Sequence, residues 1–342
     1  MRNYSRVFGA VVAIGVGCSL FGCPKPETAP PVSGGPATPS QSAAGPVSIA
    51  VIPKGTTNSF WQSVKAGADA AAADENKGGE KVKIVWQGPD IETDFTQQIN
   101  LVNTQVTSGV NAIVLAATNA EALDKPCKDA MAKGIPVVTV DSGIKDPAGS
   151  VCYIATDNVK GGALAAQDLA KLIGDKGDVG ILTFAKGSSS SDDREKGFLD
   201  EIKKHPGIHV VSNLSTDSDT TKAVNVTTNM VTSQPNIAGI FAANEPGGVG
   251  AAQALVTKHL DKKIKLVAYD ASADEIRDLK GGIIQALIVQ DPFQMGYKGV
   301  NIALQAIRKQ PIAAKFIDSG VQVVHLDDLT KPETIKLLGL AK

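Results

Sequence analysis

Ten short runs rich in Val, Ile and Ala alternate with longer helix-like segments from residue 47 onward, and this alternation limits the fold more than any other feature. The runs are SIAVIP, VKIVWQ, NAIVLAA, PVVTVD, CYIAT, DVGILTF, IHVVSN, IAGIFAA, IKLVAYD and QALIVQ. They are too continuously apolar for sheets with one face in water, so they predict strands covered by helices on both faces. Helices are expected over 58–74, 94–108, 121–133, 158–173, 192–204, 219–233, 246–258 and 293–308. The pattern is typical of α/β proteins with doubly wound parallel sheets.

The length of 342 residues exceeds that of an ordinary single domain and predicts two domains. Hydrophobic residues make up 43% of the chain and charged residues 20%, and the net charge is -1. This balance is typical of soluble globular proteins and gives no basic surface for nucleic acid. We therefore expect no nucleic-acid partner.

The N-terminus differs from the rest of the chain. Arg2 and Arg6 precede the apolar stretch VFGAVVAIGVGCSLFGC, which is short for a membrane span and well sized for a signal-peptide core. Its last residues, LFGC, resemble the lipobox of bacterial lipoproteins, which predicts a signal peptide over 1–22 and a lipid on Cys23. Cys18 is a weaker competitor, and a non-cleaved anchor or an ordinary secretion signal are alternatives. All of them predict that the rest of the chain is exported and faces the periplasm or the cell exterior.

Residues 23–46 are rich in Pro, Ser, Ala and Gly and cannot bury apolar surface. They predict a flexible tether.

Two cysteines remain in the predicted globular part, Cys127 and Cys152. In an oxidising exported compartment such a pair predicts a disulfide, and two buried free thiols are the alternative. No histidine cluster accompanies them, so no metal site is expected.

Polar side chains follow the predicted strands repeatedly, at the edge where ligands bind in open α/β sheets. They are Lys54 and Asn58, Asp141 and Ser142, Asp157 and Asn158, Ser188 through Asp193, Asn244 and Glu245, Tyr269 and Asp270, and Gln290 and Asp291. Carboxylates and amides from several strands suit a small ligand with many hydroxyl groups.

Several of these residues also have a purely structural interpretation. Asp157 and Asn158 open a helix and are expected to cap it, and Asp192 falls in a first helical turn. One of Phe60 and Trp61 is expected in the core, which leaves the other to stack on an apolar sugar face.

Catalytic motifs are missing from the sequence. It contains no GxGxxG after a strand, no GxxxxGK[ST], no HExxH and no GxSxG, and its histidines do not follow strands. The glycines of the KGG segments are interpreted as ordinary loop glycines. We expect a protein that is not an enzyme and needs no cofactor.

Seven segments, taken in order, resemble the type I periplasmic sugar-binding proteins of the ribose-binding family. They are IAVIPKGTTNSFW, GIPVVTVDS, YIATDNVKGG, DDREKGF, IFAANEPGGVGA, LVAYDAS and ALIVQDPFQMGYKG. The resemblance covers nearly all of residues 47–325. It implies the receptor of an ABC importer, a monomer that captures a sugar or polyol and delivers it to a membrane permease.

The resemblance also implies a set of ligand-binding residues. Asn58, Phe60 and Trp61 match the amide and stacking rings of the first loop. The remaining matches are Asp141, Asn244, Asp270 and Gln290, with Tyr269 beside Asp270 where a Phe is usual.

Four positions depart from the pattern of the ribose binders. Ser142 and Asp192 stand where those proteins have arginines, and Ser218 stands where a stacking Phe is usual. Arg194, which fits an RxxGF pattern, looks structural. Lys54 replaces a small hydroxyl residue and, with IPK and WQGP, resembles a branch that binds rhamnose or a furanone-type signal, in which such a lysine reaches the ligand. Pyranose ribose is therefore not the expected ligand.

The mechanism implied by the resemblance is hinge closure between two lobes, with no chemistry on the ligand. The first lobe is expected over 47–156 plus 291–321 and the second over 157–290 plus 322–342. Hinge connections are predicted near 155–158, 270–272 and 289–292. Two alternatives are a sensory receptor for a sugar-like signal and the effector domain of a transcriptional regulator, although the export signal stands where a DNA-binding helix-turn-helix would be.

Overall fold

The computed structural model describes residues 45–340, in which two six-stranded sheets build two lobes. The order of strands is β11-β5-β4-β3-β1-β2 in the first lobe and β12-β10-β9-β8-β6-β7 in the second. The predicted signal peptide, the lipid on Cys23 and nearly all of the tether lie outside the described residues. Among those described, no helix is long and apolar enough to cross a bilayer.

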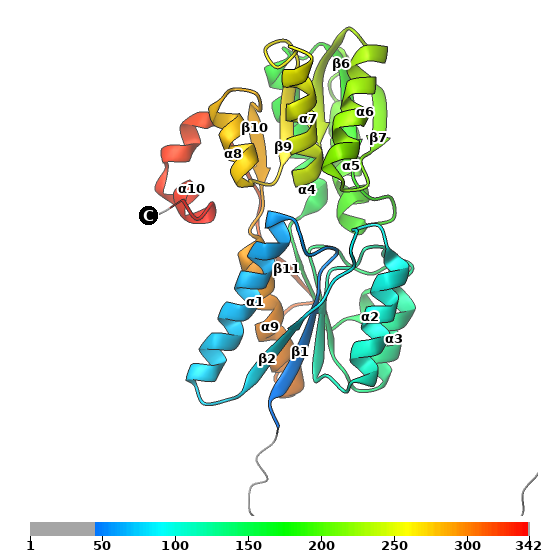
Figure 1. Ribbon diagram of the computed structural model, residues 1–342, viewed down its shortest axis with the longest axis vertical. Helices are drawn as coiled ribbons and strands as arrows, with labels where there is room; N and C mark the ends of the chain where they lie inside the picture. Colours follow the sequence, from blue (N-terminus) through cyan, green and yellow to red (C-terminus); the bar gives the residue numbers. More distant parts are fainter. Residues whose placement is uncertain (1–44, 341–342) are drawn as a thin grey trace, which may run out of the picture. The chain divides into compact units, whose positions relative to one another are not determined.

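The first lobe is a parallel sheet between two pairs of helices (Figure 1). Helices α1 and α9 cover one face, while α2 and α3 cover the other. The strands are β1 (Val47–Ile52), β2 (Val82–Trp86), β3 (Ala112–Leu115), β4 (Val137–Val140), β5 (Cys152–Ala155) and β11 (Phe316–Asp318). The helices are α1 (Ser59–Lys77), α2 (Phe95–Thr107), α3 (Asp124–Ala132) and α9 (Pro292–Ile307), with a 3₁₀ turn at Pro147–Gly149.

The second lobe repeats this arrangement, with α4 and α5 on one face of its sheet and α6, α7 and α8 on the other. The strands are β6 (Gly177–Thr183), β7 (Ile208–Ser215), β8 (Ile237–Ala242), β9 (Lys265–Tyr269), β10 (Ala286–Val289) and β12 (Gln322–Val324). The helices are α4 (Asn158–Leu172), α5 (Ser189–Ile202), α6 (Thr220–Ser233), α7 (Glu245–Thr257), α8 (Ala273–Lys280) and α10 (Pro332–Leu337), with a 3₁₀ helix at Leu326–Thr330. The two sheets have the same order of strands: β5, β4, β3, β1 and β2 of the first sheet correspond to β10, β9, β8, β6 and β7 of the second. The strands β11 and β12 lie at the remaining edges.

The predicted fold class is confirmed, and each of the ten predicted strands and eight predicted helices is present. The sequence interpretation missed β11, β12, α8 and α10. Both of these strands have only three residues, and β12 runs antiparallel to β10.

The chain passes between the two sheets three times. It does so between β5 and α4, between β10 and α9, and between β11 and β12. The predicted connection at 270–272 is wrong, because β9 before it and β10 after it belong to the same sheet. The third connection lies at residues 319–321 instead.

Two helix pairs, one in each lobe, pack at backbone contact through glycines. A Cβ at Gly67 of α1 would lie 2.0 Å from Phe293 O of α9, and one at Gly296 would lie 1.9 Å from Val64 O. In the second lobe, a Cβ at Gly162 of α4 would lie 2.0 Å from the carbonyl oxygen of Arg194 on α5. Gly162 lies within the predicted helix over 158–173, and the structure shows that it is a helix-packing residue.

Cys127 and Cys152 are free and buried, which contradicts the predicted disulfide. Cys127 lies on α3 in the hydrophobic cluster over one face of the first sheet, and Cys152 lies on β5 in the cluster over the other face. The sheet therefore separates the two thiols, and each packs as a core side chain in its own cluster.

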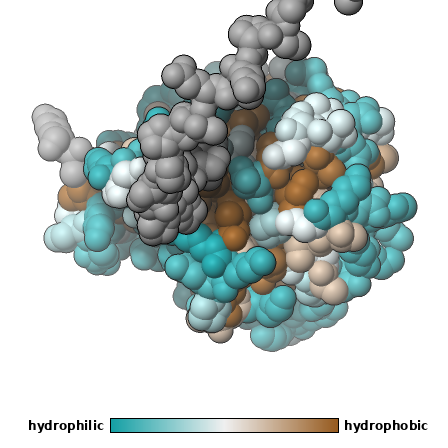
Figure 2. Space-filling model, turned by 90° about the horizontal axis from the view of Figure 1, so that it is seen from below, coloured by the Kyte–Doolittle hydropathy of each residue, from teal (hydrophilic) through white to brown (hydrophobic). Residues whose placement is uncertain are grey.

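Residues 45–340 form one compact unit with four hydrophobic clusters of its own. Figure 2 shows the protein from the end of the first lobe. Hydrophilic side chains predominate around the edge of this view, and hydrophobic side chains gather nearer its centre. A unit with its own cores is expected to fold without the preceding residues.

Candidate ligand-binding site

A small cavity lies between the lobes at the carboxyl ends of the parallel strands. Its walls come from both sheets: Lys54, Asn58, Phe60, Trp61, Glu92 and Asp141 from the first lobe, and Phe184, Arg194, Asn244, Glu245, Pro246, Asp270 and Gln290 from the second lobe and the connection after β10. The cavity contains about 290 Å³ that is not filled by atoms. The centre of a water molecule can reach only about 20 Å³ of this space. That is room for one or two waters, so in this conformation the side chains nearly fill the cavity.

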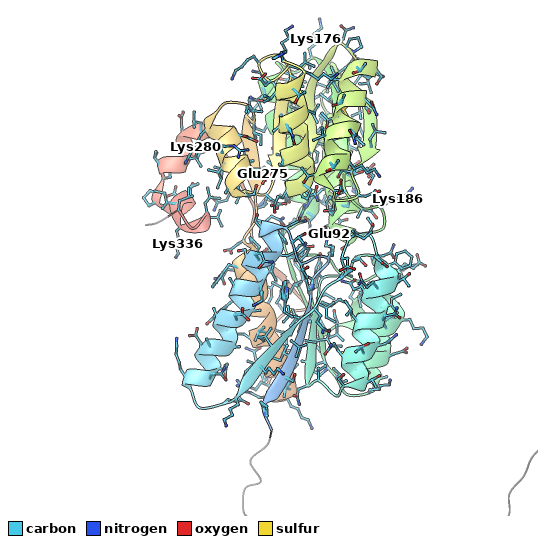
Figure 3. All side chains as sticks on the ribbon, viewed as in Figure 1. Glu92, Lys176, Lys186, Glu275, Lys280 and Lys336 are labelled. Carbon is cyan, nitrogen blue, oxygen red and sulfur yellow. The ribbon has the colours of Figure 1, made fainter. Side chains whose placement is uncertain are left out.

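Glu92 organises the wall formed by the start of α1. Its Oε1 accepts a hydrogen bond from Trp61 Nε1 at 2.7 Å and from Asn58 Nδ2 at 2.8 Å. The rings of Phe60 and Trp61 meet edge to face, with their centroids 4.9 Å apart. This wall therefore offers aromatic surface next to hydrogen-bonding groups, which is the combination that sugar rings use. Figure 3 places Glu92 where the two lobes meet.

Arg194 is the buried cation of the second lobe, with 2% of its side chain exposed. Its Nε donates to Asn158 Oδ1 at 2.8 Å, and its Nη1 donates to the carbonyl oxygen of Ala243 at 2.7 Å. Its guanidinium carbon lies 3.7 Å from the ring centroid of Tyr269, and its Nη2 lies 3.9 Å from Asp141 Oδ1. These partners fix the guanidinium beside the cavity.

Asp141 and Asp270 occupy equivalent places, directly after β4 and β9. Both have left-handed backbone conformations, with φ of 57° and 87°. This conformation is unfavourable for residues other than glycine and is concentrated at functional sites. The strained turns bring both carboxylates to the same cavity.

Asp270, Gln290 and Asn244 form the wall opposite Glu92. Gln290 Nε2 donates to Asp270 Oδ1 at 2.6 Å, and the backbone N–H of Glu245 donates to Asp270 Oδ2 at 2.9 Å. Asn244 caps α7 by accepting from Gly247 N, and its Nδ2 donates to Ser218 Oγ. The Oε1 atom of Gln290 is buried without a hydrogen-bond partner among the described residues and can accept from a ligand hydroxyl.

Burial raises the pKa of several carboxyl groups here. Desolvation is the largest cause for Glu92, Glu245 and Asp270. The Arg194 charge opposes it at Asp270, and the Lys54 charge opposes it at Glu92. Behind the wall, burial and the Asp270 charge raise the pKa of Glu275 well above its usual value.

The Glu275→Gln variant is expected to gain stability over wild type as pH rises. The pKa of Glu275 is higher in the folded protein than in the unfolded chain, so the folded protein binds this proton more tightly. The stability that the proton contributes to wild type is therefore lost as pH rises from about 4.5 through the folded-state pKa. The difference between variant and wild type should grow by up to about 1.4 kcal/mol per pH unit in that window. Urea unfolding at pH 5, 6, 7 and 8 measures it, and a difference that is constant with pH would contradict the assignment.

Eight of the eleven predicted ligand-binding residues line the cavity: Lys54, Asn58, Phe60, Trp61, Asp141, Asn244, Asp270 and Gln290. Their contact with a ligand stays a prediction. Asp157 caps α4 by accepting from Lys160 N, as expected.

Three predicted residues do not line the cavity. Asp192 is exposed and accepts from the backbone N–H of Gly187. Tyr269 is buried beneath the guanidinium of Arg194, and Ser142 is buried against Lys54. These side chains support the site from behind or face away from it.

Five lining residues were missed: Glu92, Phe184, Arg194, Glu245 and Pro246. Glu92 lies in a loop several residues after β2, so a search of strand ends passes over it. Arg194 was interpreted as structural; its hydrogen bonds to Asn158 and Ala243 agree with that, and it also lines the cavity. Glu245 was noted at the end of its strand but was not selected.

Two α/β lobes with a polar cavity between their strand ends define a two-lobed binding protein. Residues 49–311 match the profile of the periplasmic binding protein domain, and the chain belongs to this family. It is 30% identical over 276 residues to the ribose import binding protein RbsB of Haemophilus influenzae, a match that covers 81% of this chain and 91% of that protein.

Solved structures show the same likeness. A carbohydrate transporter solute-binding protein from Agrobacterium radiobacter, in complex with D-arabinose, is 35% identical with a TM-score of 0.82, over 86% of this chain and 100% of that one. An ABC transporter solute-binding protein from Agrobacterium vitis with bound D-fucose is 35% identical with a TM-score of 0.80, over 84% and 98%.

Proposed function

We propose that this protein is an exported, lipid-anchored receptor that captures a neutral monosaccharide or polyol and delivers it to an ABC importer. The observation that carries the proposal is the small interlobe cavity, in which carboxylates, amides, a guanidinium and aromatic rings converge from both sheets. The names of the relatives support a sugar as ligand.

The chemistry of the walls favours hydroxyl groups over a charged ligand. Asp141 and Asp270 already face Lys54 and Arg194, and with Glu92 and Glu245 the lining holds four carboxyl groups against two cations, which disfavours an anionic ligand. Ligand hydroxyls can donate to carboxylate oxygens and accept from amide N–H groups, while Phe60 and Phe184 offer apolar faces. A charged-group hydrogen bond contributes about 1.5 to 3 kcal/mol, so a few are enough for micromolar affinity.

Capture requires the lobes to part and close again. We propose that residues 47–156 with 291–321 move against 157–290 with 322–342, about the three connections between the sheets. Ligand contacts made only in the closed form stabilise it further, and the permease recognises the closed, liganded form.

Isothermal titration calorimetry of the 45–342 unit tests the proposed function. The panel contains D-ribose, D-arabinose, D-fucose and further monosaccharides and polyols, and at least one is expected to bind with a micromolar or lower Kd. No binding across a broad panel would count against a sugar receptor. Palmitate labelling of the full chain, with Cys23→Ser as control, tests the lipid anchor.

The Asn244→Ser variant is expected to bind the sugar about 10- to 100-fold more weakly than wild type, because it lacks the side-chain amide that lines the cavity. Serine is also a good N-cap, so the free energy of unfolding should stay within about 0.5 kcal/mol. Calorimetry and urea unfolding measure the two effects. Asn225→Ser, at an exposed position of α6, is the matched control. Wild-type affinity in Asn244→Ser would remove this residue from the ligand set.

A further inference from the structure

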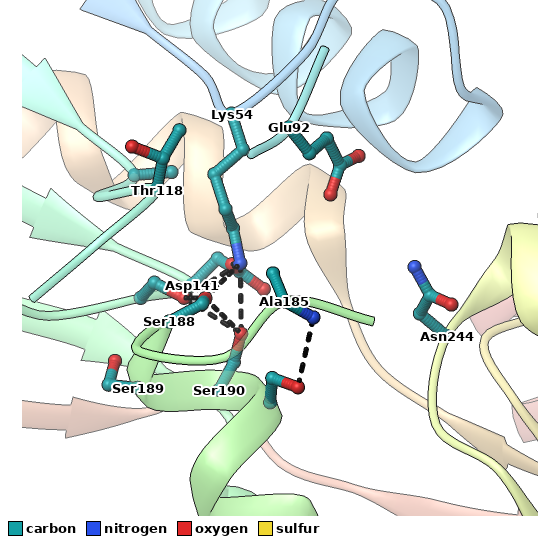
Figure 4. A network of polar contacts seen from close by, with 12 residues as sticks. Lys54, Glu92, Thr118, Asp141, Ala185, Ser188, Ser189, Ser190 and Asn244 are labelled. Carbon is teal, nitrogen blue, oxygen red and sulfur yellow. Dashed lines mark hydrogen bonds and ion pairs between the residues drawn. The ribbon is translucent and has the colours of Figure 1, made fainter. Parts of the chain in front are cut away.

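The ammonium group of Lys54 joins the two lobes. In the first lobe its Nζ lies 2.7 Å from Asp141 Oδ2 and donates to Ser142 Oγ at 2.7 Å. From the second lobe, Ser190 Oγ accepts at 2.9 Å and Ser188 Oγ at 3.2 Å (Figure 4). An ammonium has three N–H donors, and four oxygens surround this one, so protein groups engage all of its hydrogens.

The loop that carries these serines docks on the first lobe over a wider area. The backbone N–H of Gly143 donates to Ser189 Oγ at 2.9 Å, and the backbone N–H of Ala120 donates to the carbonyl oxygen of Gly187 at 2.8 Å. The serine run, which the sequence analysis noted at the end of a strand, is therefore an interlobe contact.

A second charged contact joins the lobes at the start of α1. The carboxylate of Glu245, on α7, accepts from Ser59 Oγ at 2.9 Å and from the backbone N–H groups of Phe60 at 3.1 Å and Ser59 at 3.3 Å. Asn58 is the N-cap of α1, yet its side chain makes no cap hydrogen bond and turns to Glu92. Helix N-termini favour negative charge, and here the other lobe supplies it.

We propose that Lys54 and Glu245 form two charged latches that join the lobes through protein groups alone, so that the free protein populates the closed form. Hydrogen bonds to charged groups are roughly twice as strong as neutral ones, and opening exchanges these for bonds to water. The inference rests on the proposed two-lobe capture. It makes Lys54 a positioning residue rather than a donor to the ligand.

Ligand entry depends on this closure. The latched form leaves room for only one or two waters in the cavity, so a sugar can enter only when the lobes part. When only a fraction of the free protein is in a form that admits ligand, entry is slowed by that fraction. Loss of the latches should therefore speed ligand entry.

The test compares wild type with the latch variant Ser188→Ala/Ser190→Ala/Glu245→Ala, both as 45–342 units. Each is unfolded in guanidinium and refolded to remove bound sugar, and the radius of gyration is measured by small-angle X-ray scattering with and without the best sugar of the panel. Wild type is expected to keep one radius in both conditions. The latch variant should be larger without sugar and shrink when sugar is added.

A matched control removes two exposed hydroxyls and one exposed first-turn glutamate elsewhere: Thr232→Ala/Ser233→Ala/Glu333→Ala. It should behave as wild type, and circular dichroism confirms the fold of each variant. Equal radii of sugar-free wild type and latch variant would overturn the latches. If no sugar binds any protein, the proposed sugar function fails, whereas the sugar-free radii still decide on the latches.

Discussion

Replacing Arg194 with leucine is expected to weaken sugar binding by more than about 100-fold and to lower the free energy of unfolding by about 3 kcal/mol. The change removes a buried guanidinium that bonds Asn158 and the carbonyl oxygen of Ala243 and stacks on Tyr269. Those groups lose their partner inside the protein, and the carboxylates of the cavity lose a neighbouring cation. Calorimetry and urea unfolding measure the two losses.

Two further variants separate the causes. Arg194→Lys keeps the charge but cannot present the planar fork, so it should recover part of the stability and little of the affinity. Arg277→Leu removes an arginine whose side chain is 65% exposed and should change stability by no more than about 0.5 kcal/mol. Wild-type affinity in Arg194→Leu would mean that the ligand binds outside this cavity.

The Gly162→Ala variant is expected to lose about 3 kcal/mol or more of unfolding free energy. The added Cβ would lie 2.0 Å from Arg194 O and 2.9 Å from Phe198 N, both of which are backbone atoms of α5. Backbone cannot rotate aside as a side chain can, so α4 and α5 must separate and lose buried contacts. Because α5 carries Arg194 into the cavity, sugar affinity should fall as well.

Gly281→Ala is the matched control, because its φ is -77° and a Cβ there meets nothing closer than 3.5 Å. It should be neutral or stabilise the protein by up to about 1 kcal/mol. Urea unfolding at pH 7 gives both values. A loss below 1 kcal/mol for Gly162→Ala would show that the two helices are not held at backbone contact.

The strands were predictable because each buried one is a continuous apolar run, as in β3 and β8, where nearly every residue is buried. The short edge strands β11 and β12 carry no such signal: Phe316 and Asp318 of β11 are exposed, and both strands span only three residues. Their pairing depends on the position of the sheets, which local sequence does not specify.

The site was predictable where a side chain directly follows a strand, as at Asp141, Asp270 and Gln290. The error at Asp192 has a geometric cause. Asp192 was assigned to the site because the resemblance placed it where the ribose binders have an arginine, whereas residues two apart on α5 point to nearly opposite sides. Asp192 therefore faces outward and Arg194 faces the cavity. Glu92 reaches the site through a long loop, whose path only the folded chain defines.

The lobes exchange helices: α4 follows β5 of the first sheet but packs in the second lobe, and α9 follows β10 of the second sheet but packs in the first. During synthesis, Trp61 and Val64 of the first lobe leave the ribosome well before Met295 and Val300, which complete the same hydrophobic cluster. The half that leaves the ribosome first is thus completed only after most of the second half has been made. A chain released after Gln290 would carry a bare apolar face and is expected to aggregate.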